Sequence, residues 1–342
     1  MRQKLRFLTA LSACIVFVIV FTRRGLFRRP DLSPTVNTYV RPEPANNRFN
    51  WAEKEEKFPV TSMYPLPSTR PIRIPQIQHD FKLEGYQKKA ERLKRQQAVK
   101  ESFQHSWKGY KDYAWLQDEV TPLAGGSRHS FGWATTLIDS LDTLWIMGET
   151  KEFEEAIWAL RQGVDLTSIE AEQRSIFETT IRHFGGLLAA FDVSEGQYSI
   201  LLDMAVELGD MLYAAFDTPN RMPVNWWRWR ESVENRTQVA SAGTSLAELG
   251  SLTLEFTRLS QLTQDPKFFD AVQRISNELE KAQDSTSLPG MWPLINDAAQ
   301  LSFGLDTRFS LGALSDSAYE YLPKVSFLPV WLWSANGCIS NI

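Results

Sequence analysis

The chain of 342 residues is long enough for one large domain or two ordinary ones, and its composition, 43% hydrophobic and 23% charged, is typical of globular proteins. A formal net charge of −4 gives no electrostatic case for nucleic acid as a partner. Two cysteines and four scattered histidines exclude a disulfide framework and a zinc site built on cysteines or on an HExxH pair.

The amino-terminal end carries an apolar run, residues 7–22, with arginines on both sides. The run is shorter than the roughly 20 residues that a spanning helix usually needs. We interpret residues 1–24 as a cytosolic tail and an uncleaved signal-anchor helix, with a cleaved signal peptide as the alternative. Basic residues on both sides leave the orientation undetermined by charge.

The next segment, residues 25–105, has the composition of a stem. Nine of the seventeen prolines lie between Pro30 and Pro75, which predicts an extended chain. Lys82 to Gln104 is charged throughout and predicts a solvated helix. Anchor, stem and globular part together predict a single-pass type II membrane protein with its domain in a lumen.

The globular part, from Trp107 onward, is helical in pattern, and no alternating run is long enough to predict a sheet. Helical hairpins in succession predict an all-α fold, either an α/α toroid or a helical solenoid. The predicted helices are a stripe from Trp133 to Trp145, the ranges 175–191, 199–216, 243–262 and 267–282, and one that begins near Gly312.

The helix predicted over 175–191 carries the most informative pattern. Glu178 and Arg182 are four residues apart and are therefore neighbours on one side of it. Gly185 and Gly186 interrupt the pattern, each at a cost of about 1 kcal/mol relative to alanine, which predicts a close neighbour. Taken alone, the stretch is more simply explained as an amphipathic helix with a surface ion pair.

Further carboxylates lie on other predicted helices that are otherwise apolar: Asp139, Glu248, Glu255 and Asp316. If these helices form a ring, the carboxylates would lie together at one opening of the ring. Such groups suit glycoside hydrolysis, in which one acid protonates the leaving oxygen and a second activates water, and they also suit calcium. The aromatic stretch Trp226–Trp229 is either a sugar-stacking platform or a packed loop.

Several motifs, in order, resemble glycoside hydrolase family 47, the class I α-1,2-mannosidases, with the filamentous-fungal branch closest. They are Tyr110–Trp115 with Asp118-Glu119, Thr136–Gly148, Phe177–Arg182 followed by two glycines, Leu246–Phe256 and Asp316–Leu322. The resemblance implies an (αα)7 barrel, of which residues 106–324 would be about the amino-terminal half. It also implies calcium as cofactor and a place in the membrane of the endoplasmic reticulum or Golgi.

The activity that the resemblance implies is removal of α-1,2-linked mannose from oligomannose N-glycans with inversion. By position, Glu178 resembles the acid that protonates the leaving oxygen, and Asp316 resembles a second inner carboxylate and rival acid. Arg182, Glu248 and Asp139 would bind the sugar. Leu314 stands where some members carry an arginine linked to branch choice, which implies a broader, Golgi-like specificity.

Two family features have no counterpart in this sequence: the base glutamate and the calcium-binding threonine. Residues 325–342 do not resemble the family, so we interpret them as an unrelated tail and expect this chain to be inactive. The alternative is a non-catalytic glycan-binding protein, similar to the mannosidase-like lectins of quality control in the endoplasmic reticulum. Asn235-Arg-Thr237 forms an N-glycosylation sequon.

Overall fold

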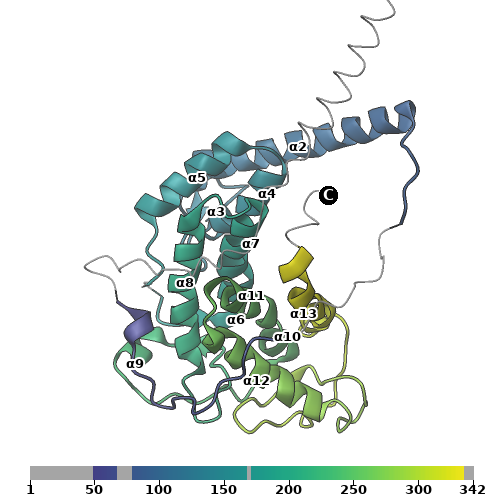
Figure 1. The fold of residues 1–342 in the computed structure, drawn as a ribbon. Helices are drawn as coiled ribbons and strands as arrows, with labels where there is room; N and C mark the ends of the chain where they lie inside the picture. Colours follow the sequence, from purple (N-terminus) through teal and green to yellow (C-terminus); the bar gives the residue numbers. More distant parts are fainter. Residues whose placement is uncertain (1–48, 68–78, 168–170, 335–342) are drawn as a thin grey trace, which may run out of the picture. The chain divides into compact units, whose positions relative to one another are not determined.

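The computed structural model describes residues 49–67, 79–167 and 171–334, so the predicted anchor at residues 1–24 lies outside the described part. The described chain is all-α, as predicted (Figure 1). Its strands are each two residues long and form three pairs. Over these residues, none of the helices combines the length and apolar character needed to cross a membrane.

The helices follow one another along the chain, with the longest connections between α2 and α3 and between α12 and α13. They are α2 (Tyr86–Ala114), α3 (Thr135–Asp139), α4 (Leu141–Ile146), α5 (Thr150–Gly163), α6 (Ile176–Glu178), α7 (Gly185–Val193), α8 (Ser199–Tyr213), α9 (Trp229–Val233), α10 (Leu246–Gly250), α11 (Thr253–Thr263), α12 (Pro266–Ala282) and α13 (Asp316–Ser334). Short helical turns are η1 (Trp51–Glu53), the π-helical η2 (Thr179–Phe184) and η3 (Ala214–Phe216).

The strands form antiparallel pairs that join distant parts of the chain. They are β1 (Glu119–Val120) with β2 (Ser127–Arg128), β3 (Arg174–Ser175) with β4 (Trp226–Trp227), and β5 (Thr244–Ser245) with β6 (Ile295–Asn296). Strand β3 leads directly into α6, and strand β5 leads directly into α10. Each of these two helices bears a candidate carboxylate.

The helix predicted over 243–262 is wrong in one respect, because the structure divides it into α10 and α11. At the break, Ser251 leaves the helical conformation (ψ 45°) and its Oγ donates a hydrogen bond to Ser317 Oγ at 2.8 Å. A Cβ added to Gly250 would lie 2.7 Å from Ala318 Cβ, so α10 and α13 are in close contact. Helix α5 is absent from the sequence-based predictions, although Phe153, Ala156 and Leu160 repeat at helical spacing and are buried.

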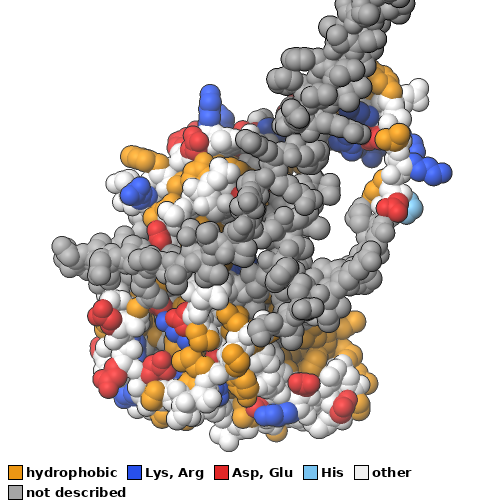
Figure 2. All heavy atoms as spheres, in the orientation of Figure 1, with side chains coloured by type: hydrophobic (Ala, Val, Ile, Leu, Met, Phe, Trp, Pro, Cys, Tyr) orange, Lys and Arg blue, Asp and Glu red, His pale blue; other side chains and the backbone are white. Residues whose placement is uncertain are grey.

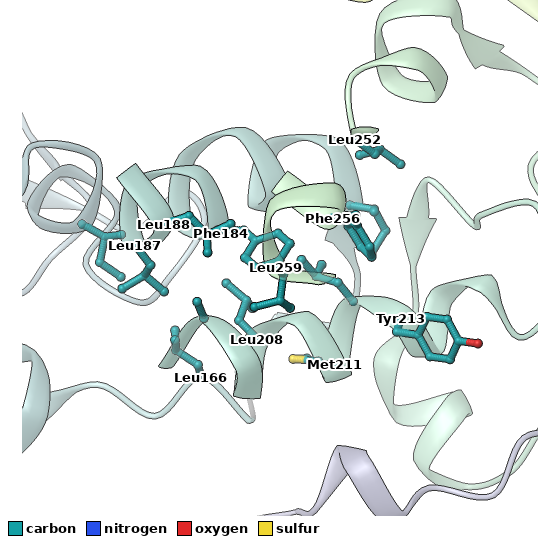
Figure 3. Close-up of a cluster of buried hydrophobic side chains, with 14 of the residues drawn as sticks. Leu166, Phe184, Leu187, Leu188, Leu208, Met211, Tyr213, Leu252, Phe256 and Leu259 are labelled. Carbon is teal, nitrogen blue, oxygen red and sulfur yellow. The ribbon is translucent and has the colours of Figure 1, made fainter. Parts of the chain in front are cut away.

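The core between α7, α8 and α11 is built from large apolar side chains (Figure 3). Leu187, Leu208 and Leu259 are completely buried, and the rings of Phe184 and Phe256 meet edge to face at 5.4 Å. Full burial of one such side chain stabilises a fold by about 1.5–3 kcal/mol. Packing of this kind keeps the helix bearing Glu178 in place.

The segment that we call the strap, residues 49–64, packs against the helices. Trp51 is 5% exposed, and its ring lies 5.4 Å from that of Trp227. The Asp217 carboxylate accepts hydrogen bonds from the backbone N–H groups of Lys57 (3.0 Å) and Phe58 (2.9 Å). For these residues the predicted stem over 25–105 is wrong, because buried anchors and charge-assisted hydrogen bonds make the strap part of the folded domain.

Hydrophobic side chains also reach the surface in the segment between α12 and α13. On the face drawn in Figure 2 they gather at the lower right, where Figure 1 shows this yellow-green segment. Its exposed leucines are Leu288, Leu301, Leu305, Leu311 and Leu314.

Candidate active site

The start of α6 fixes the position of Glu178. Ser175, the last residue of β3, has an extended backbone (ψ 116°), and its Oγ accepts a hydrogen bond from the Glu178 N–H at 3.2 Å. This is an N-cap, which satisfies one of the free N–H groups at the start of a helix. A carboxylate in the first turn is also favoured by the helix dipole. Glu178 is therefore held at a defined point, directly after a strand pair.

Arg182 connects Glu178 to a carboxylate from a different helix. Its Nε donates to Glu178 Oε2 at 2.8 Å, and its Nη1 lies 3.7 Å from Asp139 Oδ2 on α3. The ring of Phe131 lies 5.7 Å from the guanidinium. The side chains of Glu178, Arg182 and Asp139 remain 27%, 38% and 43% exposed. The ion pair expected from the spacing is present, and the fold adds a third, solvent-accessible member.

The proton affinity of Asp139 is altered by this environment. Burial raises the pKa of Asp139 and the nearby Asp142 and Glu178 add to the effect, whereas the positive charge of Arg182 opposes it. The pKa of Asp139 therefore lies above the ordinary value of an aspartate.

The helix that carries Glu178 and Arg182 contains a π-helical turn. Gly185 N–H donates to Thr180 O, five residues earlier, and closes η2 between α6 and α7. Such turns are rare and are found frequently at functional sites. The close neighbour expected at the glycines is confirmed, because a Cβ on Gly186 would lie 2.7 Å from Ile138 O. This contact sets α7 directly against the helix that ends in Asp139.

The loop that carries Phe131 is organised by the buried carboxylate of Asp118. It accepts hydrogen bonds from the backbone N–H groups of Ser130 (2.9 Å), Phe131 (3.0 Å) and Thr135 (3.1 Å). Burial alone would raise the pKa of Asp118, but hydrogen bonds from Gly132, Thr135 and Ser130 outweigh it and lower the pKa. The loop is therefore fixed by a carboxylate that stays ionised.

Two buried side chains, His183 and Arg174, contact the same loop. His183 Nε2 lies 3.0 Å from both Thr135 Oγ1 and Gly132 O. Burial, with the nearby charge of Arg174, lowers the pKa of His183 to about 3, so the ring is neutral at physiological pH. Arg174 lies 4.1 Å from the Trp133 ring, and burial lowers its pKa only to about 10, so it keeps its charge.

Glu248 lies in the first turn of α10, as Glu178 lies in the first turn of α6. Its Oε2 accepts from the Ser245 N–H (2.9 Å), while Ser245 Oγ accepts from the Glu248 N–H (3.2 Å), which is a capping box. The same Oε2 accepts from Asn225 Nδ2 at 3.2 Å. Asn225 O in turn accepts from the Ile176 N–H at 2.9 Å, so Asn225 joins the starts of both helices. Sequence reasoning missed Asn225, because only the strand pairing gives it this place.

Asp316 lies at the first turn of α13 and is exposed. Its Oδ1 accepts from the Ser317 N–H at 3.0 Å, and within the described residues no ion pair involves it. The Ala247 N–H donates to Leu314 O at 2.8 Å, which ties the residues before α13 to α10. Leu314 itself is 50% exposed and has a positive φ of 73°. The structure thus brings Glu178, Arg182 and Asp139 into contact, but does not bring Asp316 into contact with them.

Glu255 is a buried acid that the sequence marked only by its spacing from Glu248. Its Oε1 accepts a hydrogen bond from Tyr321 OH at 2.8 Å, and Oε2 has no partner within the described residues. A Cβ on Gly185 would lie 3.5 Å from Oε1, so the carboxyl lies against the π-helical turn. Burial raises the pKa of Glu255 to about 7.

Three further predictions concern aromatic, glycosylation and metal sites. Of the tryptophans at 226–229, Trp227 (1% exposed) and Trp229 (9%) are packed, whereas Trp226 is 54% exposed. Asn235 is exposed, in a turn with φ 57°. Across the described ranges, no three His, Cys, Asp or Glu side chains converge as metal ligands.

The comparisons with known proteins agree on one family. The sequence model of glycosyl hydrolase family 47 matches residues 102–330, a range that includes every candidate carboxylate and passes the expected domain limit at 324. Among solved structures, an alpha-1,2-mannosidase from Trichoderma reesei matches with a TM-score of 0.60 and 29% identity, over 72% of this chain and 55% of that chain.

Relatives of similar sequence carry the corresponding names. The mannosyl-oligosaccharide 1,2-alpha-mannosidase MNS1 of Arabidopsis thaliana is 39% identical, over 68% of this chain and 40% of its own length. The endoplasmic reticulum mannosyl-oligosaccharide 1,2-alpha-mannosidase of Homo sapiens is 39% identical, over 67% and 32%. The mannosyl-oligosaccharide alpha-1,2-mannosidase of Penicillium citrinum is 36% identical, over 67% and 46%. The chain thus spans less than half the length of these relatives.

Proposed function

Because the chain belongs to glycosyl hydrolase family 47, we propose that it recognises terminal α-1,2-linked mannose on oligomannose N-glycans and provides the acid side of an inverting glycosidase site. The observation that carries the proposal is the contact of Glu178, Arg182 and Asp139 within the matched region. The names of the plant, human and fungal relatives support the substrate class.

In this proposal Glu178 protonates the leaving glycosidic oxygen. Arg182 holds Glu178 in position and donates its remaining N–H groups to sugar hydroxyls, for which a guanidinium has a suitable fork of donors. Asp139 and Glu248 accept hydrogen bonds from hydroxyls. Asp316 is the rival acid. An inverting reaction also needs a base roughly 6.5–9.5 Å from the acid, with a water molecule between them.

Calcium is part of the proposal only through the family resemblance. No three His, Cys, Asp or Glu side chains of the described residues converge, and no step is assigned to the ion. A melting temperature that rises with added calcium and falls with a chelator would support binding.

The proposed location is the membrane of the endoplasmic reticulum or Golgi, with a single-pass type II topology. It is supported by the apolar run at residues 7–22 and by the name of the human relative. Glycosylation at Asn235, detected as a mobility shift that a glycosidase removes, would support a lumenal domain.

The experiment that tests the function measures both binding and turnover on the full chain. Mannose release from an oligomannose glycan is compared for wild type, Glu178→Gln and Asp316→Asn, and binding is measured by calorimetry. Turnover that Glu178→Gln abolishes without weakening binding supports the acid role. Binding without any turnover in wild type supports recognition of the glycan and contradicts hydrolysis by this chain, and absence of both contradicts the proposal.

A further inference from the structure

The exposed Trp226 lies directly opposite Ser175, the residue that caps the helix of the candidate acid Glu178. We propose that Trp226 stacks on a pyranose ring of the bound oligomannose glycan, on a sugar unit other than the mannose at Glu178. This inference rests on the proposed function.

The strand register gives Trp226 its position. In the β3–β4 pair, Trp226 is directly opposite Ser175, the residue that caps the helix of Glu178. Directly opposed residues of an antiparallel pair have side chains on the same face, with Cβ atoms about 4.5–5.5 Å apart. The indole therefore starts next to the cap of α6, on the face where the Ser175 hydroxyl binds the Glu178 N–H.

The backbone on either side of Trp226 is fixed. Before it, Asn225 bonds to Ile176 through its carbonyl and to Glu248 through its side chain, so it spans the two carboxylate-bearing helices. After it, Trp227 is buried against Trp51, and its Nε1 donates to Gln238 Oε1 at 2.5 Å. A platform held at both ends loses little conformational entropy when a ligand binds.

Trp226 is exposed to solvent, unlike its neighbours in the sequence, so its ring is accessible to a ligand. The indole is 54% exposed, although the residues directly before and after it are buried. One face of a pyranose ring presents C–H groups, and a flat aromatic ring with a negative π face packs well against them. Trp158 on α5 is exposed to a similar degree (67%), but α5 packs mainly on α4 rather than on the strand pair.

The test uses the full chain and two probes, a free oligomannose glycan with terminal α-1,2-linked mannose and the monosaccharide α-methyl mannoside. Trp226→Ala is expected to weaken glycan binding about tenfold, the contribution of one good aromatic contact. It should leave monosaccharide binding unchanged, because the stacked ring is a different sugar unit. Trp226→Phe should retain most of the affinity, and the matched control Trp158→Ala should bind like wild type.

The outcomes separate this inference from the proposed function. Glycan binding by Trp226→Ala equal to that of wild type overturns the stacking role and leaves the function intact. An equal loss for both probes indicates a structural role and also overturns it. A wild type that binds neither probe overturns both. If Trp226→Ala does not fold, oxidation of wild type by N-bromosuccinimide decides: the glycan should protect Trp226 and not Trp158, and equal oxidation of both contradicts the inference.

Discussion

Gly186 of α7 lies against the carbonyl of Ile138 in α3, so closely that a Cβ would be 2.7 Å from that oxygen. No side chain can be accommodated at this distance without movement of the backbone. Because Asp139 follows Ile138 directly, the same contact sets the distance between Asp139 and the helix that bears Arg182. A residue without chemistry of its own therefore determines the geometry of the carboxylate site.

Gly186→Ala should destabilise the fold by about 1–3 kcal/mol, the usual cost of overpacking a close contact. Unfolding in denaturant measures this directly. Gly109→Ala in α2 is the matched control, because nothing lies within 4 Å of a Cβ there. That substitution should stabilise the chain by about 0.5–1 kcal/mol, through helix propensity alone. Equal effects of the two substitutions would contradict the close contact.

Asp217→Asn should loosen the strap. Asp217 accepts from the N–H groups of Lys57 and Phe58 and is nearly fully buried, so loss of its charge should cost roughly 1.5–3 kcal/mol. Hydrogen exchange at the amides of Lys57 and Phe58 should accelerate. The amide of Tyr64, which Asp270 holds, should keep its protection.

The control for the strap is Asp192→Asn. Asp192 pairs with Arg258 at 2.7 Å, but its side chain is 38% exposed and it does not contact the strap. A partly exposed pair of this kind contributes about 0–1 kcal/mol. If both substitutions reduced the free energy of unfolding equally, the strap would not be part of the folded domain.

Glu255 should make stability fall as pH rises from about 4.5 to 7. Burial raises the pKa of Glu255 to about 7, so the folded chain binds this proton more strongly than the unfolded chain. The contribution is complete below the ordinary pKa of the unfolded side chain and is lost as pH rises through the folded value, up to about 3 kcal/mol in total. Free energies of unfolding from pH 4 to 8 should show this slope in wild type and not in Glu255→Gln.

A second substitution tests the cause of that slope. The hydrogen bond from Tyr321 favours the charged form of Glu255, so Tyr321→Phe should move the transition to higher pH. A transition that stayed at the same pH, or moved lower, would show that another group titrates.

Asp118→Asn should release the loop that holds Phe131 beside Arg182. An amide cannot replace a carboxylate that accepts several backbone N–H groups, and the expected cost is about 1.5–3 kcal/mol. Since the pKa of Asp118 is lowered, wild type should lose the same stability only as pH falls below the ordinary aspartate range.

Glu119→Gln is the control for this loop. Glu119 is the next residue after Asp118, but it forms an ion pair with the exposed Arg128. It should change stability by less than about 1 kcal/mol. Glycan binding should weaken in Asp118→Asn and not in Glu119→Gln. The reverse order would show that the loop does not support the site.

Much of the helical fold could be predicted from periodicity, because apolar spacing records which face of a helix is buried. The helices at 175–191, 199–216 and 267–282 agree with the structure to within a few residues. The prediction of a single helix at 243–262 was wrong. The break at Ser251 depends on a contact with α13, which is distant in the sequence. The prediction of a stem was wrong for the strap for a related reason: the composition of this stretch gives no sign of the buried carboxylates that bind its backbone.

Sequence alone determined the pairing of Glu178 with Arg182, since a spacing of four residues brings two side chains together on any helix. It also determined that something packs against Gly185 and Gly186, because two glycines in a helix are costly without a close contact. Only the tertiary structure decided that Asp139 joins the pair, that Asn225 connects it to Glu248, and that Trp226 is the exposed tryptophan of the stretch 226–229. These relationships join residues from separate helices and strands, and their distances follow from packing and register, which local spacing does not encode.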